Sequence, residues 1–185
     1  MSYASTPSRP GPRDKRLHEM LRVDHAGEYG AVQIYRGQRA IFDRARGRED
    51  IAAVLKEMEK GEAAHLKTFD RLLAERSVRP TLLAPIWNAA GFALGAATAL
   101  MGEKAAMAAT AAVEDVIEKH YAAQAAELEA AEPALAETVA RFREDELGHK
   151  ATAEAHGAKE APAFTLMRAV ISAGCRVAIG LSEKI

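Results

Sequence analysis

Two copies of a four-residue pattern, Glu-x-x-His, constrain the fold of this chain more than any other feature. The first copy is Glu62-Ala-Ala-His65 and the second is Glu146-Leu-Gly-His149. In a helix this spacing places a carboxylate and an imidazole about one turn apart on the same face. A further glutamate precedes each copy at a similar distance, Glu28 by 34 residues and Glu114 by 32 residues. The chain therefore contains a doubled unit, which is the ligand pattern of a two-metal carboxylate site inside a four-helix bundle.

Length and composition agree with one helical domain and exclude several functions. A chain of 185 residues can bury a substantial core, and its abundant alanine favours helices. The net charge of −1 gives no electrostatic basis for binding nucleic acid. Cys175 is the only cysteine, which excludes an intramolecular disulfide, a cysteine-based zinc site and an iron–sulfur cluster.

The N-terminal residues differ in character from the rest of the chain. They are rich in proline and basic residues and lack the apolar centre of a secretory signal. The prolines also argue against the amphipathic helix of a mitochondrial transit peptide. We therefore expect a disordered tail over residues 1–13 and a single domain over residues 14–185.

Apolar residues spaced by three and four predict four long helices, over residues 14–46, 49–76, 103–131 and 133–156. Each helix carries its ligand glutamate or its Glu-x-x-His in the middle of an apolar stripe, and the second stripe is expected to end at Leu72. Buried carboxylates are costly unless they are paired or bound to metal. The acids on these stripes therefore need a partner inside the bundle.

The two halves of the chain match at more than the ligand positions. Tyr35 and Tyr121 each lie seven residues after the lone glutamate, and Gln38 and Gln124 each lie ten after it. These offsets predict two related helical hairpins about a pseudo-twofold axis. The long connection between the hairpins would cross the bundle, as in ferritin-like folds.

That connection contains residues 82–102, a stretch of 21 residues without a charge. As a helix it would be about 31 Å long, enough to reach across a bilayer. Three interpretations compete: a crossover helix buried in the bundle, a helix in the membrane interface or lining an entry for an apolar ligand, and a membrane span. Pro85, Asn88 and the small residues weaken the last of these.

Residues 163–181 form a second apolar segment, which we expect to be an amphipathic helix carrying Arg168 and Arg176. It could cap the bundle. It could also lie at a membrane surface, with its arginines reaching lipid headgroups.

The doubled unit supplies six candidate metal ligands: Glu28, Glu62, His65, Glu114, Glu146 and His149. Four carboxylates match the charge of two divalent cations, and oxygen donors with one imidazole per metal suit iron or manganese. Six protein ligands leave open positions on each ion, where dioxygen can bind.

Other polar residues are candidates for supporting roles. Tyr121 and His120 are candidate catalytic residues that support a ligand or relay electrons, although Tyr35 and Tyr121 also fit core packing with a hydrogen bond. Asp24 and Asp145 are candidates to orient the ligand histidines, because a metal-bound histidine usually donates its other N–H to a carboxylate or carbonyl.

Six segments of the chain resemble the demethoxyubiquinone hydroxylase family of ubiquinone biosynthesis. They are LRVDHAGEYGAVQIYRGQ, EAAHLKTFDRLL, VRPTLLAPIWNAAGFALGAATALMG, AVEDVIEKHYAAQ, FREDELGHK and AGCRVAIGLSEKI. The resemblance extends from Leu17 to the end of the chain and includes both apolar segments. The family's ligands carry over onto the six candidate residues. Where the family often has Glu-Glu, this chain has Glu114-Asp115, which leaves Glu114 as the matched ligand.

The resemblance implies a ferritin-like bundle with two additional apolar helices and two iron ions, acting as a monooxygenase. Its substrate would be a demethoxyubiquinol with a polyprenyl tail, its co-substrate dioxygen, and NADH a candidate reductant. Family members are peripheral membrane proteins, and some work with a lipid-binding partner protein. We therefore expect membrane contact through residues 82–102 and 163–181. The expected location is the cytoplasmic face of a bacterial membrane, or alternatively the matrix face of the mitochondrial inner membrane.

Three alternatives remain beside this interpretation. An iron-oxidising protein of the ferritin or rubrerythrin type would lack the long uncharged segment, and a rubredoxin module needs more than one cysteine. A manganese catalase uses a similar site on a soluble bundle. A metal-free bundle that binds membranes does not explain six polar residues on apolar stripes.

Overall fold

The computed structural model describes residues 12–185, and over this range the chain is helical, without a strand. The elements are α1 (Pro12–Phe42), α2 (Glu49–Glu75), α3 (Ala84–Leu100), α4 (Glu103–Leu128), α5 (Pro133–Ala155), the short 3₁₀-helix η1 (Ala158–Glu160) and α6 (Phe164–Lys184). Residues 1–11, most of the predicted tail, lie outside the described residues. Pro12 and Arg13, which we assigned to that tail, instead begin α1.

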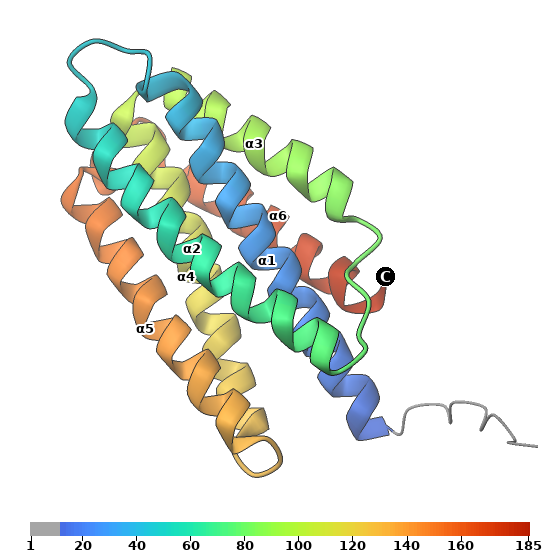
Figure 1. The fold of residues 1–185 in the computed structure, drawn as a ribbon. Helices are drawn as coiled ribbons and strands as arrows, with labels where there is room; N and C mark the ends of the chain where they lie inside the picture. Colours follow the sequence, from blue (N-terminus) through green and yellow to red (C-terminus); the bar gives the residue numbers. More distant parts are fainter. Residues whose placement is uncertain (1–11) are drawn as a thin grey trace, which may run out of the picture.

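Four of these helices form an up-and-down bundle with one crossover (Figure 1). α1 and α2 make one antiparallel hairpin, α4 and α5 make another, and α3 carries the chain from the end of α2 to the start of α4. The predicted all-α, ferritin-like bundle with two additional helices is confirmed.

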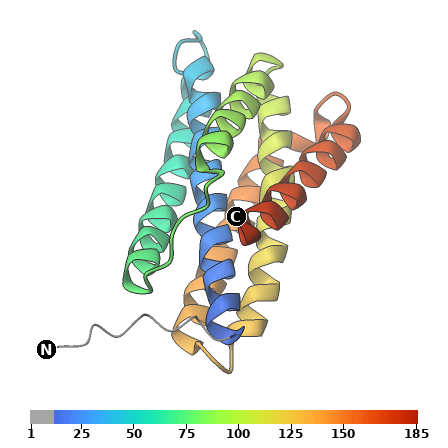
Figure 2. The ribbon, with the colours of Figure 1, turned by 90° about the vertical axis from the view of Figure 1, so that its right-hand side faces the viewer.

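The additional helices lie on the same side of the bundle, where they cross α1 and α4 obliquely (Figure 2). α3 packs mainly on α1, and α6 packs mainly on α4 with a smaller contact on α1. α2 and α5 occupy the other side. Each half of the chain is therefore a three-helix unit, in which the central helix is covered by its hairpin partner on one side and by an apolar helix on the other.

α3 crosses over as expected, but it is not buried within the bundle. Its buried residues are small or polar: Gly91, Gly95, Thr98 and Ala99. Large apolar side chains along α3 and its flanks face outward: Leu82, Ile86, Phe92, Leu100 and Met101. At 17 residues it would reach only about 26 Å, which is short for a membrane span.

Glycines allow α3 to lie directly against the backbone of α1. A Cβ atom added at Gly95 would come within 2.0 Å of the carbonyl oxygen of Ile34, and one at Gly37 would come within 2.2 Å of the carbonyl oxygen of Phe92. Backbone atoms cannot yield as the end of a side chain can. The small residues of the uncharged segment therefore serve close helix contact rather than membrane insertion alone.

α6 is amphipathic as predicted. Its inner face buries Ile171 and Ser172, while Leu166, Val170, Val177 and Leu181 lie exposed on the outer face. Within residues 12–185 it is the one helix long and apolar enough to cross a membrane by length and composition. Arg168, which we expected to reach lipid headgroups, pairs instead with Asp115 of α4 at 3.2 Å.

Most predicted helix boundaries hold to within a few residues. α1 ends at Phe42 rather than at residue 46, because the chain turns through residues 43–48 and Gly47 takes a positive φ of 73°. On α2 the last buried leucine is Leu73 instead of Leu72. Gly157 follows α5 with a φ of 81°, as expected of a residue that ends a helix in the left-handed region.

Two apolar clusters divide the interior along the bundle. One cluster lies around Tyr35, Phe42, Leu55 and Met107, at the end of the bundle that holds the α1–α2 turn. The other lies around Met20, Phe69, Tyr121 and Val139, toward the α4–α5 turn. The predicted ligands fall between these clusters on all four bundle helices.

Candidate metal centre

The six candidate ligands converge in the middle of the bundle. Two groups of four residues have donor atoms within 4.8 Å of one another: Glu28, Glu62, His65 and Glu146 form one, and Glu62, Glu114, Glu146 and His149 form the other. Glu62 and Glu146 belong to both groups. The doubled sequence unit therefore becomes a doubled site, with one glutamate from each Glu-x-x-His placed between the two halves.

Both imidazoles point their Nδ1 atoms at the carboxylates. His149 Nδ1 lies 2.8 Å from Glu62 Oε1 and 3.4 Å from Glu146 Oε2. His65 Nδ1 lies 3.3 Å from Glu146 Oε1 and 3.6 Å from Glu28 Oε2. Nδ1 is thus the inward donor of each ring, and Nε2 faces away from the cluster.

The inward-facing atoms lack hydrogen-bond partners. The unpaired buried atoms include one oxygen each of Glu28 and Glu114, both oxygens of Glu62 and Glu146, and Nδ1 of both histidines. Even the 2.8 Å approach of His149 Nδ1 to Glu62 does not have hydrogen-bond alignment. Buried polar atoms in folded proteins nearly always have a hydrogen-bond partner. Eight unpaired oxygen and nitrogen atoms around one centre are therefore suited to bind metal ions.

The close packing of buried carboxylates and imidazoles shifts the pKa values of the metal-free cluster. Burial and the nearby carboxylates raise the pKa values of Glu62 and Glu114 well above the usual range. Burial opposes ionisation of Glu146 too, but the nearby imidazoles of His149 and His65 lower its pKa to about 2. Burial likewise opposes charging of His65, yet its contacts with Glu146 and Glu28 raise its pKa to about 11. Protons thus balance part of the negative charge that two divalent cations would balance.

The two tyrosines of the repeat connect the hairpins to each other. Tyr35 on α1 donates to Glu114 Oε1 on α4 at 2.6 Å, and Tyr121 on α4 donates to Glu28 Oε1 on α1. Burial and the neighbouring carboxylates raise both phenol pKa values well above 10, so both groups stay protonated and donate. The hydrogen bond expected for these tyrosines is confirmed, and each one holds the lone glutamate of the opposite hairpin.

Of the two aspartates expected to orient ligand histidines, only Asp145 does so. Its Oδ2 lies 3.0 Å from His65 Nε2, and the Phe142 ring stacks on His65 at 3.9 Å between centroids. The expectation for Asp24 is wrong. Asp24 lies one turn before Glu28 on α1 and faces α4, where it pairs with Nε2 of His120 at 3.2 Å.

His120 lies beside the cluster and is not part of either ligand group. Its Nε2 also lies 2.9 Å from the amide nitrogen of Gln124. The chain Gln124–His120–Asp24 runs between α4 and α1 next to Tyr121. This position is compatible with the supporting role expected for His120.

An ion cluster around Asp115 was not expected from the sequence. Asp115 accepts from Lys119 on its own helix at 2.6 Å, from Lys150 on α5, and from Arg168 on α6. Burial opposes the charge, but the three cations hold the pKa of Asp115 well below its usual range. The four-residue spacing to Lys119 was a visible signal, while the contacts to α5 and α6 depend on the tertiary fold. The cluster fixes α5 and α6 to α4 beside Glu114.

Comparison with known proteins agrees with this geometry. A family model described as "Ubiquinone biosynthesis protein COQ7" matches residues 15–182. The chain belongs to the COQ7 family. The match includes all six bundle and apolar helices and every candidate ligand, so the family resemblance inferred from the sequence is confirmed.

Individual COQ7 relatives cover nearly the whole chain. The 3-demethoxyubiquinol 3-hydroxylase of Rhodospirillum rubrum is 48% identical over 179 residues, which are 97% of this chain and 82% of that protein. The human "NADPH-dependent 3-demethoxyubiquinone 3-hydroxylase, mitochondrial" is 46% identical over 91% of this chain and 78% of its own length. The mitochondrial 5-demethoxyubiquinone hydroxylase of Saccharomyces cerevisiae is 41% identical over 91% of this chain. The relatives are named as hydroxylases, which confirms the expected class of hydroxylating oxidoreductase.

Proposed function

We propose that this protein is a di-iron, dioxygen-dependent monooxygenase that hydroxylates the ring of a demethoxyubiquinol in ubiquinone biosynthesis. The observation that carries the proposal is the pair of overlapping ligand groups with eight unpaired donor atoms, in a chain of the COQ7 family. Glu28, Glu62 and His65 would hold one ion together with Glu146, and Glu114, Glu146 and His149 would hold the other together with Glu62.

Iron is the proposed metal because of both donor chemistry and family. Carboxylate oxygens with one imidazole per ion suit iron or manganese, and all four carboxylates are buried. A manganese catalase or a ferritin-type oxidase would use similar ligands. The COQ7 relatives are hydroxylases, and the exposed apolar faces of α3 and α6 have no use in a soluble iron store.

When bound, the iron pair supplies the two-electron activation of dioxygen. One oxygen atom replaces a ring hydrogen as a hydroxyl group, and the other leaves as water after taking up two protons and two electrons. We propose a reduced nicotinamide cofactor as the electron source; NADH was the expected candidate, and the name of the human relative specifies NADPH. Tyr35 and Tyr121 would hold Glu114 and Glu28 in place, and His120 would support Tyr121.

The proposed substrate carries a polyprenyl tail and therefore resides in a membrane. Exposed apolar residues gather on the outer sides of α3 and α6, which lie on the same side of the bundle (Figure 2). A smaller apolar cluster around Ile34, Val113 and Ile171 connects α6 and α1 to α4, which carries Glu114. We propose that residues 82–102 and 163–181 rest on the membrane surface, where a lipid-binding partner protein would also act. The bacterial cytoplasmic face and the mitochondrial matrix face remain the two candidate locations.

Charging the exposed face of α3 tests the membrane proposal. Phe92 is 42% exposed, so Phe92→Lys should fold normally yet release the protein from vesicles in a flotation assay. Replacing one inserted aromatic by a charge should weaken partitioning about tenfold or more. Ala63→Lys, at an exposed position of α2, is the control and should leave flotation unchanged. Equal flotation of Phe92→Lys and wild type would refute membrane contact through α3.

Quinone profiling of cells that lack this protein tests the reaction itself. We expect demethoxyubiquinone to accumulate and ubiquinone to disappear, because the ring would no longer be hydroxylated. Mass spectrometry of lipid extracts measures both species, and re-expression of the wild-type chain should restore the normal profile. A normal ratio of the two quinones in the deleted strain would end the proposal.

A further inference from the structure

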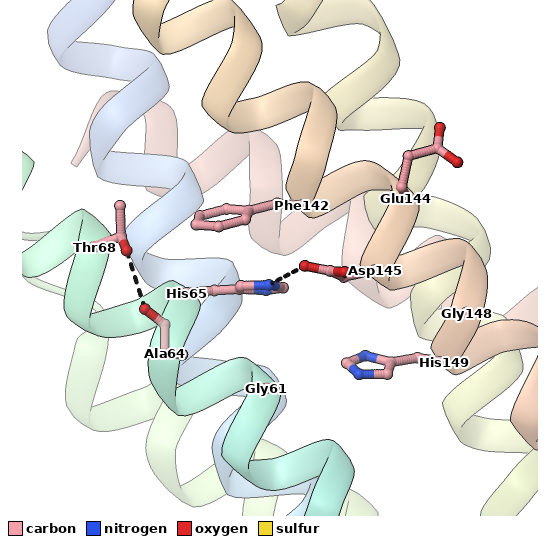
Figure 3. Close-up of a pocket in the computed structure, with 9 residues that line it drawn as sticks. All are labelled: Gly61, Ala64, His65, Thr68, Phe142, Glu144, Asp145, Gly148 and His149. Atoms are coloured by element: carbon pink, nitrogen blue, oxygen red, sulfur yellow. Dashed lines mark hydrogen bonds and ion pairs between the residues drawn. The ribbon is translucent and has the colours of Figure 1, made fainter.

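A cleft of about 570 Å³ opens between α2 and α5, on the side of the bundle away from α3 and α6. Figure 3 shows that its walls converge on the two ligand histidines. The residues on its walls include small ones, Gly61 and Ala64 on α2 and Gly148 on α5. α2 and α5 contact each other at only a few places. The cluster is therefore closest to solvent at this cleft, whereas apolar clusters close it along the bundle axis.

The two histidines at the base of the cleft are held unequally. His65 is fixed twice, by the hydrogen bond between its Nε2 and Asp145 and by stacking against Phe142. His149 Nε2 makes no hydrogen bond or ion pair with residues 12–185, and the side chain of His149 is more exposed than that of His65, at 16% against 5%. Figure 3 shows the His149 ring extending into the open part of the cleft.

The sequence repeat explains why an aspartate holds His65 and none holds His149. Asp145 immediately precedes Glu146 in the second motif, and Gly61 occupies the equivalent position before Glu62 in the first. Asp145 crosses from α5 to hold the histidine of α2, but Gly61 has no side chain to hold the histidine of α5. A Cβ atom at position 61 would lie 3.2 Å from His149 Nε2 and 3.3 Å from its Cε1. Glycine at position 61 offers no carboxylate to hold His149, and it leaves room for the His149 ring to move.

The rim of the cleft is acidic. Glu144 and Asp145 lie beside the opening with side chains that are 70% and 59% exposed; Glu144 lies 3.7 Å from Arg143 of the same helix, and Asp145 reaches His65. Carboxylates on a rim raise the local concentration of cations, and this attraction falls with added salt. The rim leads to imidazoles, and behind the imidazoles lie the unpaired oxygens of Glu62 and Glu146.

We propose that this cleft is the port through which divalent cations enter the centre, with His149 as the hinged ligand that opens and closes it. The proposal rests on the metal centre proposed above and assigns its loading route. A cation attracted by Glu144 and Asp145 meets His149, whose ring swings into the room beside Gly61 and returns with Nδ1 toward Glu62. His65 stays fixed by Asp145 and Phe142, and the ion that it binds reaches it after passing His149.

The test is the rate at which the metal-free, full-length protein takes up Co²⁺, followed by stopped-flow absorbance in the visible range. Gly61→Ala should slow uptake about tenfold, because the added methyl group restricts the His149 ring. The final stoichiometry should remain two ions per chain. Gly148→Ala is the matched control: it adds the same methyl group in the same cleft, where a Cβ atom meets nothing within 4 Å, and uptake should be unchanged.

A surface variant tests the same port without changing its interior. Glu144→Gln should slow uptake severalfold at low salt and reduce its dependence on ionic strength. If wild type binds two ions but both Gly61→Ala and Glu144→Gln load at its rate, the port proposal is wrong and the metal centre stands. If wild type itself binds no Co²⁺, the proposed metal centre fails and the port fails with it.

Discussion

Replacing Glu62 or Glu146 with alanine should abolish hydroxylation and reduce the metal content from two ions per chain to less than one. Each of these glutamates belongs to both ligand groups, so one substitution removes a donor from both ions. Activity should fall by at least about 10³-fold, since the proposed activation of dioxygen would depend on both metal ions. The protein should remain helical, because the apolar clusters at the two ends of the bundle are untouched.

The thermal stability of the metal-free protein tests independently whether these carboxylates serve the metal centre or the fold. In the metal-free protein, burial and the neighbouring carboxylates raise the pKa of Glu62 well above its usual range, so the folded state must keep a proton on this acid at neutral pH, which costs stability. Isosteric Glu62→Gln is neutral without that cost and should unfold at an equal or higher temperature than wild type. A purely structural glutamate would show the opposite change. Circular dichroism on heating and metal analysis of the same samples measure both effects.

Glu59→Ala is the matched control on the same helix. Glu59 lies three residues before Glu62 and accepts hydrogen bonds from Arg36 and Arg39, outside the cluster. This variant should keep two metal ions and its activity while losing some stability. Unchanged iron stoichiometry in both Glu62→Ala and Glu146→Ala would overturn the assignment of the centre.

Gly95→Ala should be among the most destabilising single substitutions in the chain. The added Cβ atom would lie 2.0 Å from the carbonyl oxygen of Ile34, 2.8 Å from its carbon and 3.0 Å from the backbone nitrogen of Gln38. These are backbone atoms of α1, which cannot move without displacing Glu28 and Tyr35. Overpacking typically costs 1–3 kcal/mol, and we expect about 3 kcal/mol or more where backbone meets backbone.

Denaturant unfolding and limited proteolysis measure this effect. α3 should become sensitive to protease first, because its contact with α1 is the one that fails. Gly27→Ala on α1 is the control, since a Cβ atom there meets nothing within 4 Å. That change should raise stability by up to about 1 kcal/mol through helix propensity alone. Gly95→Ala with wild-type stability would show that the two helices are not in the close contact described.

The clearest difference between sequence and structure concerns residues 82–102. An uncharged stretch of this length occurs in core helices, in interfacial helices and in membrane spans, although Pro85, Asn88 and the small residues weaken the last of these. The structure places it outside the bundle, because Gly91 and Gly95 match the backbone of α1 while Ile86 and Phe92 remain exposed. Composition reports how apolar a helix is, and it does not report which face another helix covers.

The aspartates illustrate the same limit within the site. Asp24 and Asp145 were equally good candidates to hold a ligand histidine, since each lies on a ligand-bearing helix close to the cluster. Only the relative rotation of the helices decides that Asp145 reaches His65 and that Asp24 reaches His120. Gly61 carried no signal by itself, and its consequence for His149 follows from the distance across the cleft.

The sequence by itself determined the helices of the bundle, the inward position of all six candidate ligands and the doubled arrangement of the candidate centre. These are properties of spacing along one helix, where three or four residues make a turn and a repeated offset returns the same geometry. Only the tertiary structure decided the contacts between helices: Tyr35 with Glu114, Tyr121 with Glu28, and α3 against α1. It also decided that the Glu62–Ala–Ala–His65 motif faces a cleft in which an aspartate holds only one of the two histidines. Such contacts join residues far apart in the chain, so they depend on how helices rotate and approach one another, which local periodicity does not specify.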